Sequence, residues 1–227
     1  MYAPDTQRTA WQTLWARIRA ELTPLGIDAP HTLSWGEDAF AWGRPGLVLG
    51  QCCGRPLALG RAGAAQVVGA FDFGLTDCPP GTYRSAILRN PAGRPRAAIN
   101  DPDSQSGCAA LIAWTGRRLE APLVTGAHLS SITALQRGEA RLAAVDAQTY
   151  ALWRQDGGAL PPVELVDWTP PVPAPPLITA HAGHVAPLRK AVRAALGSLP
   201  EVAARLRLFG FVDRERADYA LLGCAAN

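Results

Sequence analysis

Apolar side chains recur at helical spacing near the start of the chain. They follow the i, i+3, i+4, i+7 rule of one helix face, at Trp11, Leu14, Trp15, Ile18 and Leu22. This pattern predicts a helix over about Thr6–Leu22. Asp5 or Thr6 would supply the N-cap oxygen, and Pro24 would prevent the helix from continuing.

Short apolar runs alternate with helical patterns through the middle of the chain. The runs that predict strands are 47–50, 66–71, 83–88, 96–99 and 142–145, and helical patterns cover 106–114 and 130–136. The first run leads into 51–56, which predicts a loop because it contains glycine and proline. Strands that alternate with helices indicate an α/β fold with mostly parallel central sheets.

The stretch 161–176 is rich in proline, which predicts an extended connector rather than a regular element. Beyond it, Val185, Leu188, Val192 and Leu196 predict another amphipathic helix, and 198–201 has the pattern of a capping box for one more. We therefore expect the C-terminal part of the chain to be helical.

Composition narrows the classes of function. The 227 residues have 48% hydrophobic side chains and a formal net charge of +3. The basic residues are scattered, which argues against a nucleic-acid partner, and the apolar stretches are too short for membrane insertion. Five cysteines without a CxxC spacing indicate neither a disulfide framework nor a zinc site.

The segment Ile99–Cys108 is the first candidate for chemistry. A predicted strand ends there and a helix begins with Ser104, Ser106 and Gly107. Helix-start amides, serine hydroxyls and a glycine that admits a ligand to the backbone together suit an anion. The alternative is that Ser104 or Ser106 only caps the helix.

A second segment, Thr125–Ser131, repeats this arrangement and adds His128, whose ring could donate to an oxyanion. Asp146 follows the predicted strand 142–145 and could accept from a protonated ligand oxygen or an ammonium group. A structural histidine and a helix-capping aspartate are the alternatives for these two residues.

Two other chemistries have weaker support. Cys52 or Cys53 with His128 and Asp146 would form a nucleophile, base and acid, but neither cysteine stands in a hydrolase signature. His181 and His184 lack further metal ligands nearby. We expect no catalytic residue, no metal and no cofactor.

Six ordered segments together resemble the phosphate/phosphite/phosphonate substrate-binding family of ABC transporters. They are 49–57, 83–85, 98–100, 104–107, 126–128 and 144–146. The resemblance implies a type II periplasmic-binding-protein fold, in which two α/β lobes joined by two crossings hold the ligand. It implies lobe one at 1–87 plus 180–227, lobe two at 91–175, and hinge segments near 83–90 and 176–179.

The resemblance also implies the ligand-binding residues. They are Ser104, Gln105, Ser106 and His128 as anion contacts, Asp146 as a strand-end acid, Tyr83 as a hinge aromatic, and Tyr2 and Gln51 from lobe one.

We therefore expect a monomeric protein that binds phosphate, phosphite or a phosphonate reversibly between closing lobes, with an ABC permease as the implied partner. The alternatives are an enzyme on the same fold and a cytoplasmic ligand sensor. The sequence opens on Met1-Tyr2 without a signal peptide, so we expect a periplasmic location if a signal was removed and a cytoplasmic one otherwise.

Overall fold

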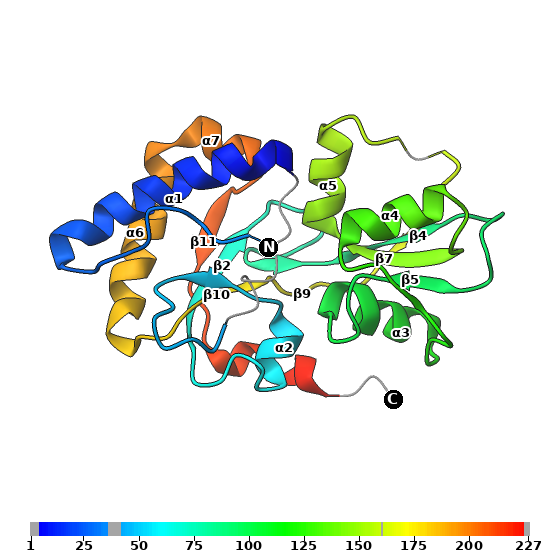
Figure 1. The fold of residues 1–227 in the computed structure, drawn as a ribbon, viewed down its shortest axis with the longest axis horizontal. Helices are drawn as coiled ribbons and strands as arrows, with labels where there is room; N and C mark the ends of the chain where they lie inside the picture. The colour runs from blue at the N-terminus through cyan, green and yellow to red at the C-terminus, as the bar shows by residue number, and fades with distance from the viewer. Residues whose placement is uncertain (1–4, 36–41, 160, 225–227) are drawn as a thin grey trace. The chain divides into compact units, whose positions relative to one another are not determined.

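The computed structural model describes residues 5–35, 42–159 and 161–224, and these divide into two compact units (Figure 1). Unit 1 combines the chain up to Thr82 with Pro173–Gly223, and unit 2 is built from Tyr83–Val172. The chain passes between the units twice, through β3 (Thr82–Tyr83) and β9 (Val172–Pro173), which pair with each other. The first crossing overlaps the start of the expected hinge segment 83–90, and the second lies just before the expected segment 176–179.

A four-stranded antiparallel sheet forms the centre of unit 1. Its order is β1 (Gly50–Gln51), β10 (Pro176–Thr179), β2 (Gln66–Asp72) and β11 (Gly210–Val212). The predicted parallel pairing does not occur here, because β10 returns from unit 2 and enters between β1 and β2 in the opposite direction. Five consecutive residues of β2 are buried, as expected for a central strand.

Helices pack around the sheet of unit 1. The periodic face of α1 is buried as predicted and packs along α6, whose Leu188 and Val192 are also buried. The α-helices of unit 1 are α1 (Arg8–Leu22), α2 (Gly54–Ala58), α6 (Val185–Ser198) and α7 (Pro200–Arg205), and its 3-10 turns are η1 (Asp5–Gln7), η2 (Thr23–Leu25), η5 (Ala182–His184) and η6 (Arg216–Gly223).

Unit 2 contains a five-stranded mixed sheet. Its order is β6 (Leu123–Val124), β5 (Ala97–Ile99), β7 (Leu142–Asp146), β4 (Ser85–Arg89) and β8 (Glu164–Trp168). The predicted parallel pairing is found here, since β5 runs parallel to both β6 and β7. The β4 strand is antiparallel to both β7 and β8.

Helices cover both faces of this sheet, with α3 on one side and α4 and α5 on the other (Figure 1). Successive residues of β4 point to opposite faces, so Ile87 packs with Leu111 of α3 while Leu88 packs with Ile132 of α4. The helices are the π-helical turn η4 (Gln105–Ala109), α3 (Ala110–Thr115), α4 (His128–Gln136) and α5 (Ala147–Gln155).

Several local predictions were wrong. The predicted strand 47–50 is a strand only from Gly50, and Gln7 rather than Asp5 or Thr6 is the N-cap residue of α1. The predicted loop at 51–56 contains the short helix α2, which begins at Gly54. The proline-rich stretch contains β8, because Glu164–Trp168 has no proline and can pair with β4 at the edge of the sheet. The C-terminal part includes β11, which pairs with β2. The helix α2 packs against η6, β8 pairs with β4 and β11 pairs with β2, so partners far along the chain decide these three conformations.

Within the described parts of the chain, every helix is too short or too polar to cross a lipid bilayer.

Candidate anion-binding site

Three strands of unit 2 end at one edge of its sheet. Because β5, β6 and β7 are parallel, their carboxyl ends lie at the same edge. Asn100 and Thr125 directly follow β5 and β6, and Asp146 is the last residue of β7. The antiparallel β4 begins there, since Ser85 pairs with Asp146. Carboxyl ends of parallel strands are where open α/β sheets place their ligands.

The first turn at this edge joins β5 to η4. The Ser104 hydroxyl accepts a hydrogen bond of 3.0 Å from the Gly107 amide, and the Ser104 carbonyl accepts one of 3.0 Å from Ala109 five residues on. This wider spacing makes the first turn π-helical, a distortion that is frequent at functional sites. Ser104 and Ser106 are both buried, so their hydroxyls are shielded from bulk water.

Gly107 is required by close packing. A β-carbon at this position would collide with the side-chain oxygen of Asn100. Asn100 is itself only 5% exposed, and its backbone carbonyl accepts a hydrogen bond from Gly126. The glycine therefore lets the helix start approach the end of β5.

The second turn joins β6 to α4 and is bonded to the first. The amides of Thr125 and Gly126 donate to the carbonyls of Ile99 and Asn100, over 2.8 and 3.0 Å. Gly126 has φ +80°, a conformation that favours glycine. The N-cap of α4, Ala127, has no side-chain oxygen, so the cap leaves the first-turn amides of α4 to other acceptors.

His128, the first residue of α4, connects the two turns with Asp146. The His128 Nε2 atom lies 2.9 Å from the Ser106 Oγ and 3.4 Å from the Asp146 Oδ2. The other carboxylate oxygen of Asp146 accepts a 2.8 Å hydrogen bond from Thr149 at the start of α5. Asp146 thus caps a helix and also contacts the histidine.

Burial controls the charge of His128. Its side chain is only 6% exposed, and loss of solvation lowers its pKa below the usual value, although the Asp146 carboxylate and the Ala144 carbonyl act in the opposite direction. The ring is therefore neutral at neutral pH. With Ser106 it offers polar hydrogen-bonding groups without a fixed positive charge.

The geometry differs from that of a serine hydrolase. In a catalytic triad the acid contacts the imidazole nitrogen that does not face the nucleophile, whereas Asp146 and Ser106 both face Nε2. Cys52 does not have the properties of a nucleophile either, because burial, and then the neighbouring Cys53, raise its pKa. The cluster of Ser106, His128 and Asp146 is better arranged to form hydrogen bonds with a ligand than to activate a nucleophile.

The other expected ligand-binding residues are distributed over both units, and their contact with a ligand stays a prediction. Gln105 is part of η4, and Tyr83 is buried at the first crossing. Gln51 ends β1 in unit 1, where its amide donates to the Pro175 carbonyl over 3.4 Å. Tyr2 lies outside the described residues.

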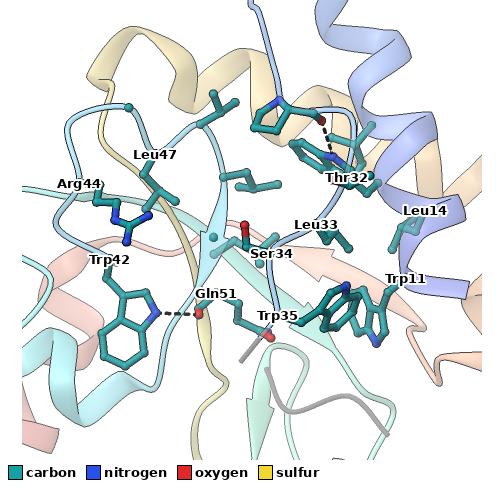
Figure 2. A pocket seen from close by; sticks show the side chains of 18 of the residues that line it. Trp11, Leu14, Thr32, Leu33, Ser34, Trp35, Trp42, Arg44, Leu47 and Gln51 are labelled. Atoms are coloured by element: carbon teal, nitrogen blue, oxygen red, sulfur yellow. Dashed lines mark hydrogen bonds between the residues drawn. The ribbon is translucent and has the colours of Figure 1, made fainter. Parts of the chain in front are cut away.

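Unit 1 contains a cavity that the sequence analysis missed (Figure 2). It has a volume of about 420 Å³, and its lining includes Trp11, Trp15, Trp35, Trp42 and Gln51. The lining tryptophans all precede β1 in the sequence, but the helical spacing of Trp11 and Trp15 predicts only one apolar face of a helix. Among the described residues, no group of three or more His, Cys, Asp and Glu side chains could hold a metal.

Comparison with solved structures shows the fold. PhnD1 from Prochlorococcus marinus, in complex with methylphosphonate, superposes with a TM-score of 0.73 at 12% identity, over 94% of this chain and 91% of PhnD1. XAC2383 from Xanthomonas citri bound to ATP superposes with a TM-score of 0.68 at 13% identity, over 95% of this chain and 93% of XAC2383.

A binding protein component of an ABC phosphonate transporter from Pseudomonas aeruginosa gives a TM-score of 0.67 at 12% identity, over 96% of this chain and 80% of that one. The chain therefore has the type II periplasmic-binding-protein fold that the resemblance implied. Neither a family model nor a curated protein matches the sequence.

Gly107→Ala should weaken the packing between the first turn and β5. The added methyl group meets Asn100, so we expect a loss of about 1–3 kcal/mol in the free energy of unfolding, measured by urea denaturation. Gly197→Ala is the matched control, because Gly197 lies in α6 with open space around it. Equal stabilities of Gly107→Ala and the wild type would contradict this packing.

His128→Gln should reduce the dependence of stability on pH. The unfolded chain protonates His128 near its usual pKa of about 6.5, whereas the folded chain resists protonation until a lower pH. The unfolded state therefore binds more protons, and wild-type stability falls as pH drops from about 6.5 to the lowered pKa. Denaturation at several pH values should show a shallower fall for His128→Gln than for the wild type, and equal slopes would contradict a lowered pKa of His128 in the folded state.

Proposed function

We propose that this chain is a solute-binding protein that binds a small oxyanion, namely phosphate, phosphite or a phosphonate, reversibly and without chemical conversion. The observation that carries the proposal is the cluster of Ser106, His128 and Asp146 at the carboxyl edge of parallel strands, beside two helix starts. These side chains and the amides of the helix starts can each donate a hydrogen bond to an oxygen of the ligand or accept one from it.

Helix starts supply most of the attraction for an anion. The first amides of a helix lack intrahelical acceptors, and the aligned peptide dipoles place about half a positive charge at that end. The Ser106 hydroxyl can turn toward the guest and donate to it. A neutral imidazole can donate a further hydrogen bond, so binding needs neither a lysine nor an arginine.

Asp146 adds selectivity for a protonated oxygen. Its carboxylate can only accept hydrogen bonds, and beside a fully deprotonated guest it would face another negative charge. A phosphate or phosphonate that retains one P–OH group can donate to Asp146, whereas sulfate has no such proton at neutral pH. The site therefore favours phosphorus oxyanions over sulfate.

The solved structures of the same fold are consistent with this chemistry. PhnD1 holds methylphosphonate and XAC2383 holds ATP, and both ligands carry oxygens on phosphorus. By analogy with the Pseudomonas aeruginosa transporter component, we propose that an ABC permease receives the ligand. The protein would work as a monomer, and in the periplasm if a signal peptide is removed from it. The contact of Asp146 with the same His128 nitrogen that faces Ser106, and the buried thiol of Cys52, favour a binding protein over an enzyme.

Isothermal titration should detect this binding directly. We expect wild-type protein to bind phosphate, phosphite or methylphosphonate, and Ser106→Ala to lose about tenfold in affinity or more, because a hydrogen bond to a charged group contributes about 1.5–3 kcal/mol. Ser130→Ala, an exposed serine on the same helix as His128, serves as the matched control. Wild-type affinity in Ser106→Ala would contradict the site.

Asp146→Asn should reduce discrimination against sulfate. Asparagine keeps an oxygen that can cap Thr149 but has no charge to repel a deprotonated guest. We expect wild-type protein to prefer phosphate over sulfate by about tenfold or more, and the variant to narrow that ratio toward unity. Competition titrations measure both ratios. An unchanged ratio would show that Asp146 does not contact the guest.

A further inference from the structure

A second pocket lies at the other end of the unit 2 sheet. Its lining includes the residues at which β5 and β7 begin, whereas the candidate anion-binding site lies where these strands end. The pocket has a volume of about 320 Å³, at the lower end of the usual range for small-molecule sites, about 300–1,000 Å³. All of its lining residues belong to unit 2.

Arginine side chains dominate the charge of this pocket. Four of them line it, namely Arg96, Arg117, Arg118 and Arg141. Among the described lining residues Glu120 is the one acidic side chain, which leaves an excess of three positive charges. A guanidinium stays protonated in proteins and forms paired hydrogen bonds with carboxylate and phosphate oxygens. The pocket is therefore suited to an anion that carries more than one negative charge.

Two of the arginines are held by hydrogen bonds to the backbone. The Nε atoms of Arg96 and Arg141 donate to the carbonyls of Glu139 and Gly93, over 2.8 and 3.2 Å. These bonds use only Nε, so the terminal N–H groups of each guanidinium remain for other acceptors. A ligand would meet guanidinium groups that are already oriented, which lowers the entropy cost of binding.

The backbone that carries these two arginines is closely packed. The Arg141 amide donates to the Arg96 carbonyl over 2.9 Å, so the two residues are neighbours. A β-carbon at Gly93 would collide with the carbonyl oxygen of Ala140, which shows how closely the two backbone segments approach each other. The first half of the pocket is therefore a fixed frame.

The other two arginines follow α3, which ends at Thr115. Arg117 and Arg118 are both exposed, and within the part of the chain that the structure describes neither belongs to an ion pair. Leu119 and Leu142 also line the pocket and pack against the buried cluster around Leu111. Like charges next to an apolar wall repel each other more strongly than in open water, and a bound anion would relieve that repulsion.

We propose that this arginine-lined pocket is a second anion-binding site, and that it binds a small polyanion with two or more phosphate groups, such as pyrophosphate or triphosphate. A phosphate group presents oxygens in several directions, so it can accept from arginines on different walls, whereas a carboxylate is planar. A single phosphate would leave much of the volume and of the positive charge unused.

The second site differs in chemistry from the candidate site at the other end of the same strands. There the side-chain donors are the hydroxyl of Ser106 and the neutral ring of His128, and here they are guanidinium groups. Binding at the arginine-lined pocket should therefore weaken steeply with salt and with each arginine removed. It does not depend on the proposed function of the candidate site.

Calorimetric titration with pyrophosphate tests the inference. We expect the wild type to bind pyrophosphate about tenfold or more tightly than Arg117→Gln/Arg118→Gln does, because the variant loses two charge-assisted contacts. Arg154→Gln/Lys190→Gln is the matched control, since it removes the same net charge from two exposed positions outside the pocket. Equal affinities of the two double variants, or no binding of pyrophosphate to the wild type, would overturn the proposal.

Citrate tests the chemical class of the ligand. It carries three carboxylates, and we expect it to bind the wild type more weakly than pyrophosphate does. Citrate that binds more tightly than pyrophosphate, and that loses this affinity in Arg117→Gln/Arg118→Gln, would contradict the preference for phosphate groups.

A Ser106→Ala background separates the two sites. The same pair of pyrophosphate titrations, with and without Arg117→Gln/Arg118→Gln, should give the same loss of about tenfold or more when Ser106 is alanine. A ratio that falls to unity in this background would place pyrophosphate at the candidate site and overturn the second one. Loss of methylphosphonate binding alone, with the pyrophosphate ratio intact, would contradict only the proposed function.

Discussion

The parallel pairing of β5 with β6 and β7 is the constraint on which the candidate site depends. It brings the ends of three strands, and therefore Asn100, Thr125 and Asp146, to one edge of the sheet of unit 2. The turns that follow are then bonded to each other through Ile99 and Asn100. Two helix starts and a carboxylate meet there because the strands are parallel and end in register.

Burial gives this edge its chemical character. A charged histidine would attract an anion more strongly, but the low solvation at His128 keeps the ring neutral even beside Asp146. The proposed recognition of an anion would then depend on hydroxyl, imidazole and amide groups with fixed directions. Hydrogen-bond donors with fixed directions distinguish ligands by the arrangement of their oxygens. A flexible cationic side chain would distinguish them mainly by their total charge.

The two units offer different environments to a ligand. Unit 2 provides the polar edge around Ser106 and His128, and unit 1 provides an apolar cavity lined by tryptophans. The fold itself does not determine the guest, since the solved structures that share it hold ligands as different as methylphosphonate and ATP.

The sequence predicted the local elements with strong periodicity and the segments of the candidate site. The helix α1 and the strands β2, β5 and β7 follow directly from the spacing of apolar residues. It could not predict α2, β8 or β11, because their conformations depend on partners far along the chain. The contact of His128 with Ser106 spans 22 residues, and the cavity around Trp42 needs walls from several segments, so neither is visible in a local pattern.

The central claim is that Ser106 and His128 bind the oxygens of a phosphorus oxyanion. The most direct test is a crystal structure of the protein with bound methylphosphonate. We predict that its oxygens lie within hydrogen-bond distance of the Ser106 hydroxyl and the His128 ring, at the starts of η4 and α4. Methylphosphonate bound at another place, with the hydrogen bond between Ser106 and His128 intact, would contradict the account.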